Sequence, residues 1–384
     1  MIKKGSSNYV YAMHPLVHTW GRDRLTFNER ERCCLMAYVT LSCSLRQDES
    51  QPYRFQRILV THVRANMEYS RSERNQNIIS YLDDAYAKFG DLLQKQGYMK
   101  EAEILQIQVL DTRNESLGVE HPDTIRAMAS LASTNRDLGK WTEAEKLEIE
   151  VLEARNRIFG VEHPDTIHAM GNLAETYYKL GRYTEAEKLT IQVLDARNRI
   201  LGVEHPDTIN ATANLAAIYR KLGKYTEAEK LQIQVLDTRT RILGVEYPDT
   251  IISMANLAAI YQKLGKYTEA EKLQIQVLDA STRILGVEHP DTITDMERLA
   301  ATYHNLGKYT EAEELKIQVL DARTRILGVE HPDTINAMGH LAVTYQKLGK
   351  YTEAHKLAVQ TQERRNKFPR AESPHMNLRD KDMK

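Results

Sequence analysis

The stretch GVEHPDTINATANLAAIYRKLGKYTEAEKLQIQVLDTRTRIL, residues 202–243, returns along this chain with few changes. Successive copies lie 42 positions apart, as from Gly118 to Gly160. The opening word GVEHPDT, which reads GVEYPDT in the copy at Gly244, stands at Gly118, Gly160, Gly202, Gly244, Gly286 and Gly328. A fixed period of this length is typical of repeat proteins, so the repetition decides how the rest of the sequence is interpreted.

The first half of each repeat predicts a helix that begins at a proline. In residues 202–243, Pro206 presets a helical φ, and Asp207 or Thr208 can cap the free N–H groups of the first turn. Apolar residues then recur at a helical spacing, and Gly223 ends the helix. The residues expected to face the core are Ile209, Leu215, Ala216, Ile218, Tyr219 and Leu222.

The second half of each repeat predicts another helix, which ends at the glycine that opens the next copy. Thr226 is its expected cap and Gly244 its expected stop. Asp237 and Arg241 stand four residues apart, in the order that favours an ion pair on a helix surface. The expected apolar stripe consists of Ala228, Leu231, Val235, Leu236 and Ile242. One such hairpin cannot bury its own stripe, so the copies are expected to stack on one another.

A seventh, degenerate copy precedes the six clear ones. It begins near Tyr86, and its Gly97 lies 42 positions before Gly139. We therefore expect seven helix-turn-helix units within residues 78–367. Their approximate bounds are 78–116, 122–158, 164–200, 206–242, 248–284, 290–326 and 332–367.

The repeat resembles a known family through its small and large packing residues. The positions that carry the resemblance are Leu173, Ala174, Tyr177, Gly181, Tyr183, Ala186 and Leu194. They match the pattern of tetratricopeptide repeats (TPR), and the 42-residue period with LG-x-x-HPD between units resembles the kinesin-light-chain subtype. The resemblance implies an all-α fold, a right-handed superhelical solenoid of about seven repeats. In such a solenoid, the first helix of each pair lines a concave groove.

The repeated His-Pro-Asp could suggest catalysis, or a J-domain co-chaperone. A J-domain carries one copy, however, and six identical catalytic centres at a solenoid period are implausible. Tyr247 also replaces the histidine in one copy while the rest of the motif stays intact. We therefore interpret the tripeptide as a helix-starting turn.

Motifs that carry chemistry are absent from the sequence. It contains no G-x-S-x-G, H-E-x-x-H, C-x-x-C or G-x-x-x-x-G-K-[ST]. His14 and His18 stand four residues apart, but no third metal ligand is near them. We expect no catalytic residues, no metal site and no cofactor.

Composition and charge exclude other classes of partner. The formal net charge is −1, which gives no general attraction to nucleic acid or to an anionic membrane. No run of about 18 apolar residues exists, so no membrane span is expected. The cysteines, Cys33, Cys34 and Cys43, lack the spacing of a metal site. We expect a cytoplasmic protein.

The units differ from one another mainly along one stripe of the first helix. In the copy at residues 206–222, this stripe consists of Asn210, Ala213, Asn214, Ala217 and Arg220. Their spacing puts them on one helical face, away from the packing face. The units thus share a scaffold and vary the surface expected to face a ligand. Drift among recently duplicated repeats is the alternative explanation.

The kinesin-light-chain resemblance adds a role for an asparagine in the motif N-L-A, which holds the backbone of an extended peptide. Asn172, Asn214 and Asn256 occupy that place here. An amide can both donate to and accept from one peptide unit. The candidate groove residues are Asn172, Asn214, Asn256, Arg298, His340, Ser130, Tyr178, Arg220, Gln262, His304 and Glu297. The alternative is a solvated polar face without a ligand.

The ends of the chain do not repeat. Residues 8–13 alternate like a strand, and residues 1–26 resemble the last winged-helix segment of NB-ARC (STAND, NLR-like) proteins that carry C-terminal TPRs. Met13-His14 matches the nucleotide-sensing pair of that family, although Pro15 stands where many relatives have Asp. We expect a helical connector at 27–77, including an amphipathic helix at 53–70, and a disordered tail at 368–384.

The leading hypothesis is a non-catalytic scaffold that binds a peptide or protein in the TPR groove, as the sensor arm of an NLR-like receptor. The NTPase domain of such a receptor is missing from these 384 residues, so the chain is expected to be a fragment or a truncated product. A kinesin-light-chain-like cargo adaptor is the second hypothesis, although residues 1–77 show no heptad coiled coil. A structural spacer with no groove ligand is the third.

Overall fold

The computed structural model describes residues 3–4, 11–12, 26, 36, 42, 57, 59–64 and 76–367. Near the N-terminus, β1 (Lys3–Lys4) pairs antiparallel with β2 (Tyr11–Ala12). β2 lies inside the stretch that alternates like a strand. Met13-His14, the remaining winged-helix-like residues, His18 and the tail at 368–384 lie outside the described residues.

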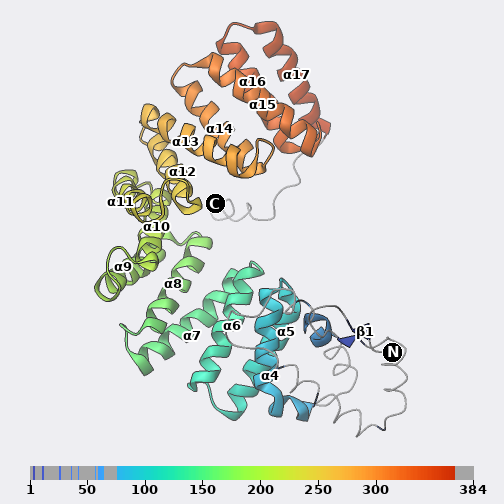
Figure 1. The fold of residues 1–384 in the computed structure, drawn as a ribbon, viewed down its shortest axis with the longest axis vertical. Coiled ribbons are helices and arrows are strands. Elements are labelled where there is room, and N and C mark those ends of the chain that lie inside the picture. Colours follow the sequence, from blue (N-terminus) through green and yellow to red (C-terminus); the bar gives the residue numbers. More distant parts are fainter. Residues whose placement is uncertain are drawn as a thin grey trace, which may run out of the picture. The chain divides into compact units, whose positions relative to one another are not determined.

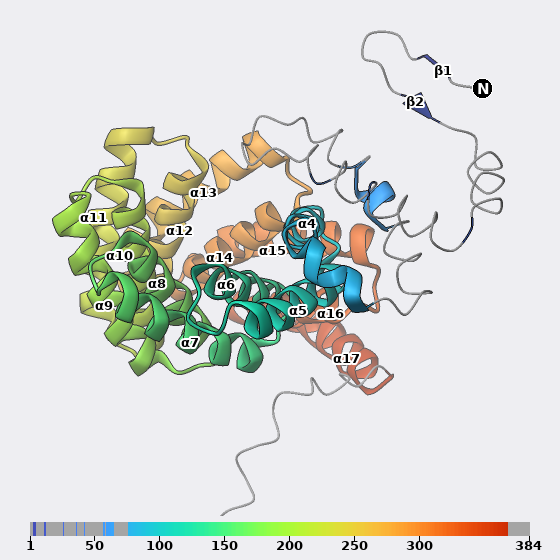
Figure 2. The same ribbon diagram turned by 90° about the horizontal axis from the view of Figure 1, so that it is seen from below.

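Residues 76–367 form a series of helical pairs, which Figures 1 and 2 show as successive hairpins. The first helices of the pairs are α4 (Gln76–Lys95), α6 (Pro122–Asp137), α8 (Pro164–Lys179), α10 (Pro206–Lys221), α12 (Pro248–Lys263), α14 (Pro290–Asn305) and α16 (Pro332–Lys347). The second helices are α5 (Met99–Ser116), α7 (Trp141–Phe159), α9 (Tyr183–Ile200), α11 (Tyr225–Leu243), α13 (Tyr267–Leu285), α15 (Tyr309–Leu327) and α17 (Tyr351–Lys367). The all-α prediction with about seven repeats is confirmed.

The chain divides into two compact units, Met1–Leu189 and Thr190–Lys384, with the boundary inside α9. In the first unit, each helix from α4 to α8 packs on the next one along the chain. In the second unit, the same holds from α10 to α17. Within each unit, stacking therefore buries the stripe that a single hairpin leaves exposed.

Proline opens the first helices as expected, but the cap comes from another residue. His205 is the N-cap of α10, and its Nδ1 accepts a hydrogen bond from the backbone N–H of Asp207 at 3.2 Å. The same bond recurs at His121, His163, His289 and His331. The prediction that Asp207 or Thr208 caps this helix was wrong, because the imidazole stands one position before the proline, where an acceptor reaches the first free N–H, that of Asp207.

The copy with tyrosine shows the same turn without the cap. Tyr247 has the extended backbone of the histidines, with φ −73° and ψ 138°, but its side chain makes no capping hydrogen bond. The phenol oxygen lies at the far end of a ring, whereas Nδ1 lies next to Cβ. His-Pro-Asp is thus a local helix start in which the histidine contributes the acceptor.

The second helices begin two residues earlier than a threonine cap would place them. α11 starts at Tyr225 with Lys224 as its N-cap, and no side chain caps it. The prediction of a Thr226 cap was therefore wrong, since that residue lies inside the first turn. The predicted stop at Gly244 is confirmed: it is the C-cap, and its φ of 91° with ψ 164° is a conformation that favours glycine.

The packing residues largely follow the predicted stripes. Leu215 and Ala216 of α10 are buried, as are Ala228 and Val235 of α11. Ile242 is 48% exposed, so its assignment to the packing stripe was wrong. It stands in the last turn of α11, which leads into a loop whose other apolar side chains are exposed too.

Ion pairs connect the ends of four second helices to the loop that opens the same repeat, rather than successive turns of one helix. Arg241 contacts Glu204 of the preceding loop at 2.8 Å. The equivalent pairs are Arg157–Glu120, Arg283–Glu246 and Arg325–Glu288. The direct contact of Arg241 is thus to the glutamate of the GVE loop, and the predicted partner Asp237 adds a smaller electrostatic interaction, since Glu204 and then Asp237 raise the pKa of this arginine.

A second set of pairs connects successive second helices. Lys266, just before α13, contacts Glu229 of α11 at 2.6 Å. Lys308 and Glu271 repeat the contact at 2.6 Å. Such exposed pairs add little stability individually, but each one fixes the register between two consecutive repeats.

A helical segment ahead of α4 covers apolar residues of the first repeat. Residues 59–64 are helical, and the side chains of Leu59, Val60 and Val63 are buried in one core cluster with Phe89. This segment therefore shields apolar side chains of the first pair that no preceding repeat covers.

Candidate functional site

The variable stripe of the first helices lies apart from the buried face. In α10, Asn210 and Asn214 are exposed and Arg220 is half-buried, whereas Leu215 and Ala216 are buried. The stripe is thus available for contacts outside the scaffold.

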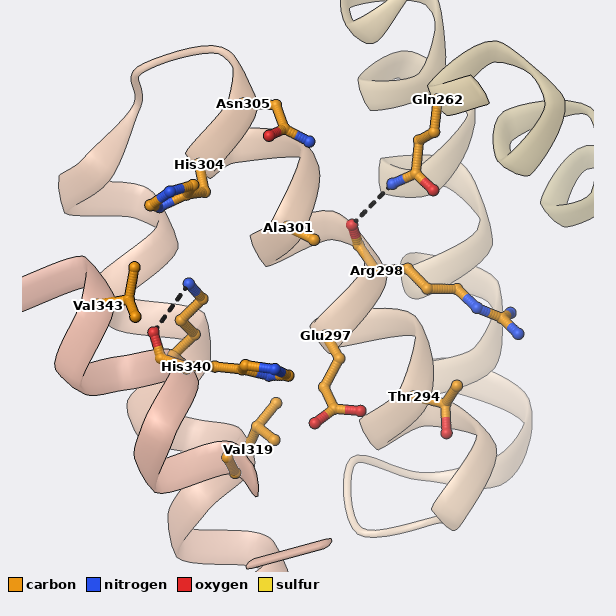
Figure 3. A pocket seen from close by; sticks show the side chains of 12 residues that line it. Gln262, Thr294, Glu297, Arg298, Ala301, His304, Asn305, Val319, His340 and Val343 are labelled. Carbon is orange, nitrogen blue, oxygen red and sulfur yellow. Dashed lines mark hydrogen bonds between the residues drawn. The ribbon is translucent and has the colours of Figure 1, made fainter. Parts of the chain in front are cut away.

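In the second unit, stripe residues from three first helices border one pocket of about 410 Å³ (Figure 3). Gln262 comes from α12, and His340 comes from α16. Glu297, Arg298 and His304 come from α14 between them. Five of the predicted groove residues are therefore brought together.

In the first unit, a pocket of about 250 Å³ contains two more predicted residues, Ser130 of α6 and Asn172 of α8. Tyr178 is half-buried, and its ring meets that of Tyr183 edge-on, with 5.5 Å between centroids.

Four predicted groove residues line neither of these pockets: Tyr178, Asn214, Asn256 and Arg220. Asn214 is exposed, while Asn256 and Arg220 are half-buried. Their assignment to a binding groove stays a prediction.

The charged residues of the larger pocket are paired separately rather than with each other. Glu297 accepts a hydrogen bond from Arg323 of α15 at 2.7 Å, and burial raises the pKa of its carboxyl group. Arg298 contacts Asp295 at 3.3 Å. The charged groove end expected from Glu297 and Arg298 is thus largely neutralised by these two partners.

One residue of this pocket was missed by the sequence reasoning. Lys316 projects from α15, and its Nζ donates to Thr344 Oγ1 at 2.6 Å and to the backbone oxygen of His340 at 3.2 Å. Burial lowers the pKa of this lysine. It stands in the second helix, where the repeats look uniform, but its position is one of the few there that changes. The equivalent residues are Glu148, Thr190, Gln232 and Gln274.

Two imidazoles border the same pocket. Burial, followed by the charge of Lys316, lowers the pKa of both His304 and His340. Among the described residues, Nδ1 of His304 is buried without a hydrogen-bond partner. Neutral imidazoles beside a cation leave the pocket poor in negative charge.

Metal and membrane sites are not supported by the part of the chain that is described. Over the described residues, no group of three or more His, Cys, Asp or Glu side chains could hold a metal ion. Within the same residues, no helix combines the length and apolar character that crossing a membrane requires.

Comparison with known proteins identifies the repeat. The tetratricopeptide repeat model matches residues 81–157, 129–199, 165–241, 207–267, 249–315 and 295–367. The chain belongs to the tetratricopeptide repeat family. TPR proteins are generally protein-interaction scaffolds.

Among solved structures, this TPR chain is similar to a Podosopora anserina protein, described as a kinesin light chain with nearly identical TPR-like repeats. The two share 32% sequence identity with a TM-score of 0.50, over 55% of this chain and 100% of that chain. No curated protein matches the TPR chain.

Two more distant structures share the fold alone. A signal transduction ATPase with numerous domains (STAND), which has a TPR sensor and comes from Pyrococcus horikoshii, has a TM-score of 0.59 at 15% identity. The match covers 93% of this chain and 56% of that chain. The apo form of RapI has a TM-score of 0.51 at 12% identity and covers 74% of this chain and 97% of that chain.

Proposed function

We propose that this TPR chain is a non-catalytic scaffold that binds a peptide or protein along the variable stripe of its first helices. The observation that carries the proposal is the pocket between α12, α14 and α16. Five residues singled out because they vary between repeats border this single hollow. A largely apolar hollow bordered by a few polar side chains suits recognition of a peptide backbone and its side chains.

The asparagine ladder is the backbone-binding part of this proposal. Asn172 borders the pocket of the first unit, and Asn214 and Asn256 occupy the equivalent position in α10 and α12. Each amide offers both a donor and an acceptor to an extended chain. Such a ladder would bind chain shape, while the varying neighbours would select side chains.

Within this scaffold role, we favour the sensor arm of an NLR-like receptor, supported by the resemblance of residues 1–26 to a winged-helix end. The second candidate is a kinesin-light-chain-like adaptor, which the similarity to the Podosopora anserina protein favours. Both candidates use the same groove, and they differ in the partner.

The test compares partners of the native chain with those of a triple variant, Asn172→Ala, Asn214→Ala and Asn256→Ala. The matched control replaces three exposed second-helix amides at the same 42-residue period, Gln192→Ala, Gln234→Ala and Gln276→Ala. Affinity capture from lysate with quantitative mass spectrometry identifies the partners, after circular dichroism shows equal helicity.

Loss of specific partners in the asparagine variant, with retention in the glutamine variant, supports the groove. Recovery of an NTPase domain would favour the receptor arm, and recovery of motor subunits would favour the adaptor. Equal partner lists for both variants would refute binding through the asparagines.

A further inference from the structure

In the five second helices from α7 to α15, one polar side chain at an equivalent position lies inward, toward the neighbouring first helices. We name this the inward position; it holds Glu148, Thr190, Gln232, Gln274 and Lys316. The first four side chains are no more than 5% exposed. In the first unit, Glu148 contacts Arg136 of α6 at 3.3 Å, and in the second unit Gln232 donates to the backbone oxygen of Ser253 at 3.2 Å.

The inward position therefore places polar groups of four chemical kinds beneath the first-helix stripe along the chain. A carboxylate, a hydroxyl, amides and an ammonium stand there in turn, while the surrounding residues stay nearly constant. A buried polar group is costly unless it is hydrogen-bonded or ion-paired. The residue at the inward position therefore limits which ligand groups can bind above it.

Lys316 is the cation in this series, and its bonding leaves capacity toward the pocket. Its ammonium has three N–H donors, of which one is given to Thr344 Oγ1 and one to the oxygen of His340. Both partners are neutral.

The nearby carboxylates already have cationic partners of their own. Glu297 contacts Arg323 at 2.7 Å, and Asp295 contacts Arg298 at 3.3 Å. Because each of these carboxylates is balanced by its own arginine, Lys316 supplies the excess positive charge of the pocket.

The groups around the two imidazoles reinforce that surplus. His304 faces Lys316 from α15 and Lys347 from α16. His340 faces Lys316 and Arg323 from α15 and Arg365 from α17. The charges that shift these two rings are all positive.

We propose that the pocket between α14 and α16 binds a carboxylate side chain of the groove's peptide ligand, and that Lys316, at the inward position, selects it. This inference rests on the proposed groove function and names the chemistry of one subsite. The carboxylate would accept the remaining N–H of Lys316, while Ala301 and Val343 enclose its aliphatic stem.

The experiment titrates the full chain, labelled with ¹³C-histidine, with sodium acetate against sodium chloride at constant ionic strength. The ring signals of His304 and His340 are assigned from His304→Gln and His340→Gln variants. We expect a saturable shift of both signals, and a rise of about one unit in imidazole pKa with acetate bound.

The variant that tests selection by Lys316 is Lys316→Gln. Glutamine fits the repeat at this position, since Gln232 and Gln274 occupy it in other repeats. We expect it to abolish the saturable response. The control, Lys272→Gln on the exposed face of α13, should respond as the native chain does. Urea unfolding confirms that both variants are folded.

A response that persists in Lys316→Gln, or no saturable response in the native chain, would overturn the inference. A stronger response to inorganic phosphate than to acetate would overturn the carboxylate assignment. Because the acetate titration needs no peptide, its result is independent of the asparagine variants. The groove proposal and this subsite can therefore fail separately.

Discussion

Exchanging the capping residues of α10 and α12 tests whether the histidine of His-Pro-Asp stabilises the helix start. The loops before both helices read GVE-x-PDTI, so His205 and Tyr247 stand in the same context. Replacing a capping side chain costs about 0.5–2 kcal/mol. Since the side chain of His205 is 40% exposed, we expect the lower half of that range, about 0.5–1 kcal/mol. This corresponds to a roughly two- to fivefold change in local opening.

The assay is amide hydrogen exchange by NMR at the capped N–H itself. His205→Tyr should speed exchange at Asp207 by about two- to fivefold, and Tyr247→His should slow exchange at Asp249 by the same factor. Tyr247→Ala serves as the control, because neither residue offers an acceptor close to Cβ, and it should leave Asp249 unchanged. If Tyr247→His has no effect at Asp249, the histidine is not a cap and the reasoning fails.

Three other substitutions test the effects of backbone conformation and burial. Gly160→Ala should destabilise by about 1–3 kcal/mol, because φ 84° with ψ 168° suits glycine alone. Gly171→Ala should stabilise the fold by about 0.5–1 kcal/mol, because Gly171 lies inside α8 and a Cβ added there would meet open space. If the two glycine variants shift the urea midpoint in the same direction and by the same amount, the explanation from backbone conformation is contradicted. Burial raises the pKa of Asp295, so the stability this group contributes is present below pH 3.8 and is lost as pH rises through the folded pKa. Asp295→Asn should therefore raise the urea midpoint at neutral pH but not in strong acid, and a gain of equal size at both pH values would refute this explanation.

The sequence by itself determined the repeat, the helical pairs and their ends. The ring of Pro206 fixes φ, and Gly244, which lacks a Cβ, can adopt a positive φ that other residues avoid, so they mark a helix start and a helix stop whatever surrounds them. Apolar spacing similarly predicted that Leu215 and Val235 are buried. The varying stripe was also readable, because the chain supplies its own alignment of near-identical copies.

Pairing between side chains was decided only by the tertiary structure. Arg241 has acceptable carboxylates both on its own helix and in the loop before α10, and only the packing of α11 against α10 selects Glu204. His205 and Asp207 are both plausible caps, and the choice depends on ångström-scale geometry.

The burial of the Lys316 side chain could likewise not be predicted from the sequence. It stands among charged residues in the motif EAEELKIQVL, which suggests a solvated position. Stacking of α15 against α16 brings its ammonium under the first-helix stripe, beside Thr344. Helical periodicity tells which side of a helix a residue occupies, but only the neighbouring repeat decides whether that side meets water, a core or a pocket.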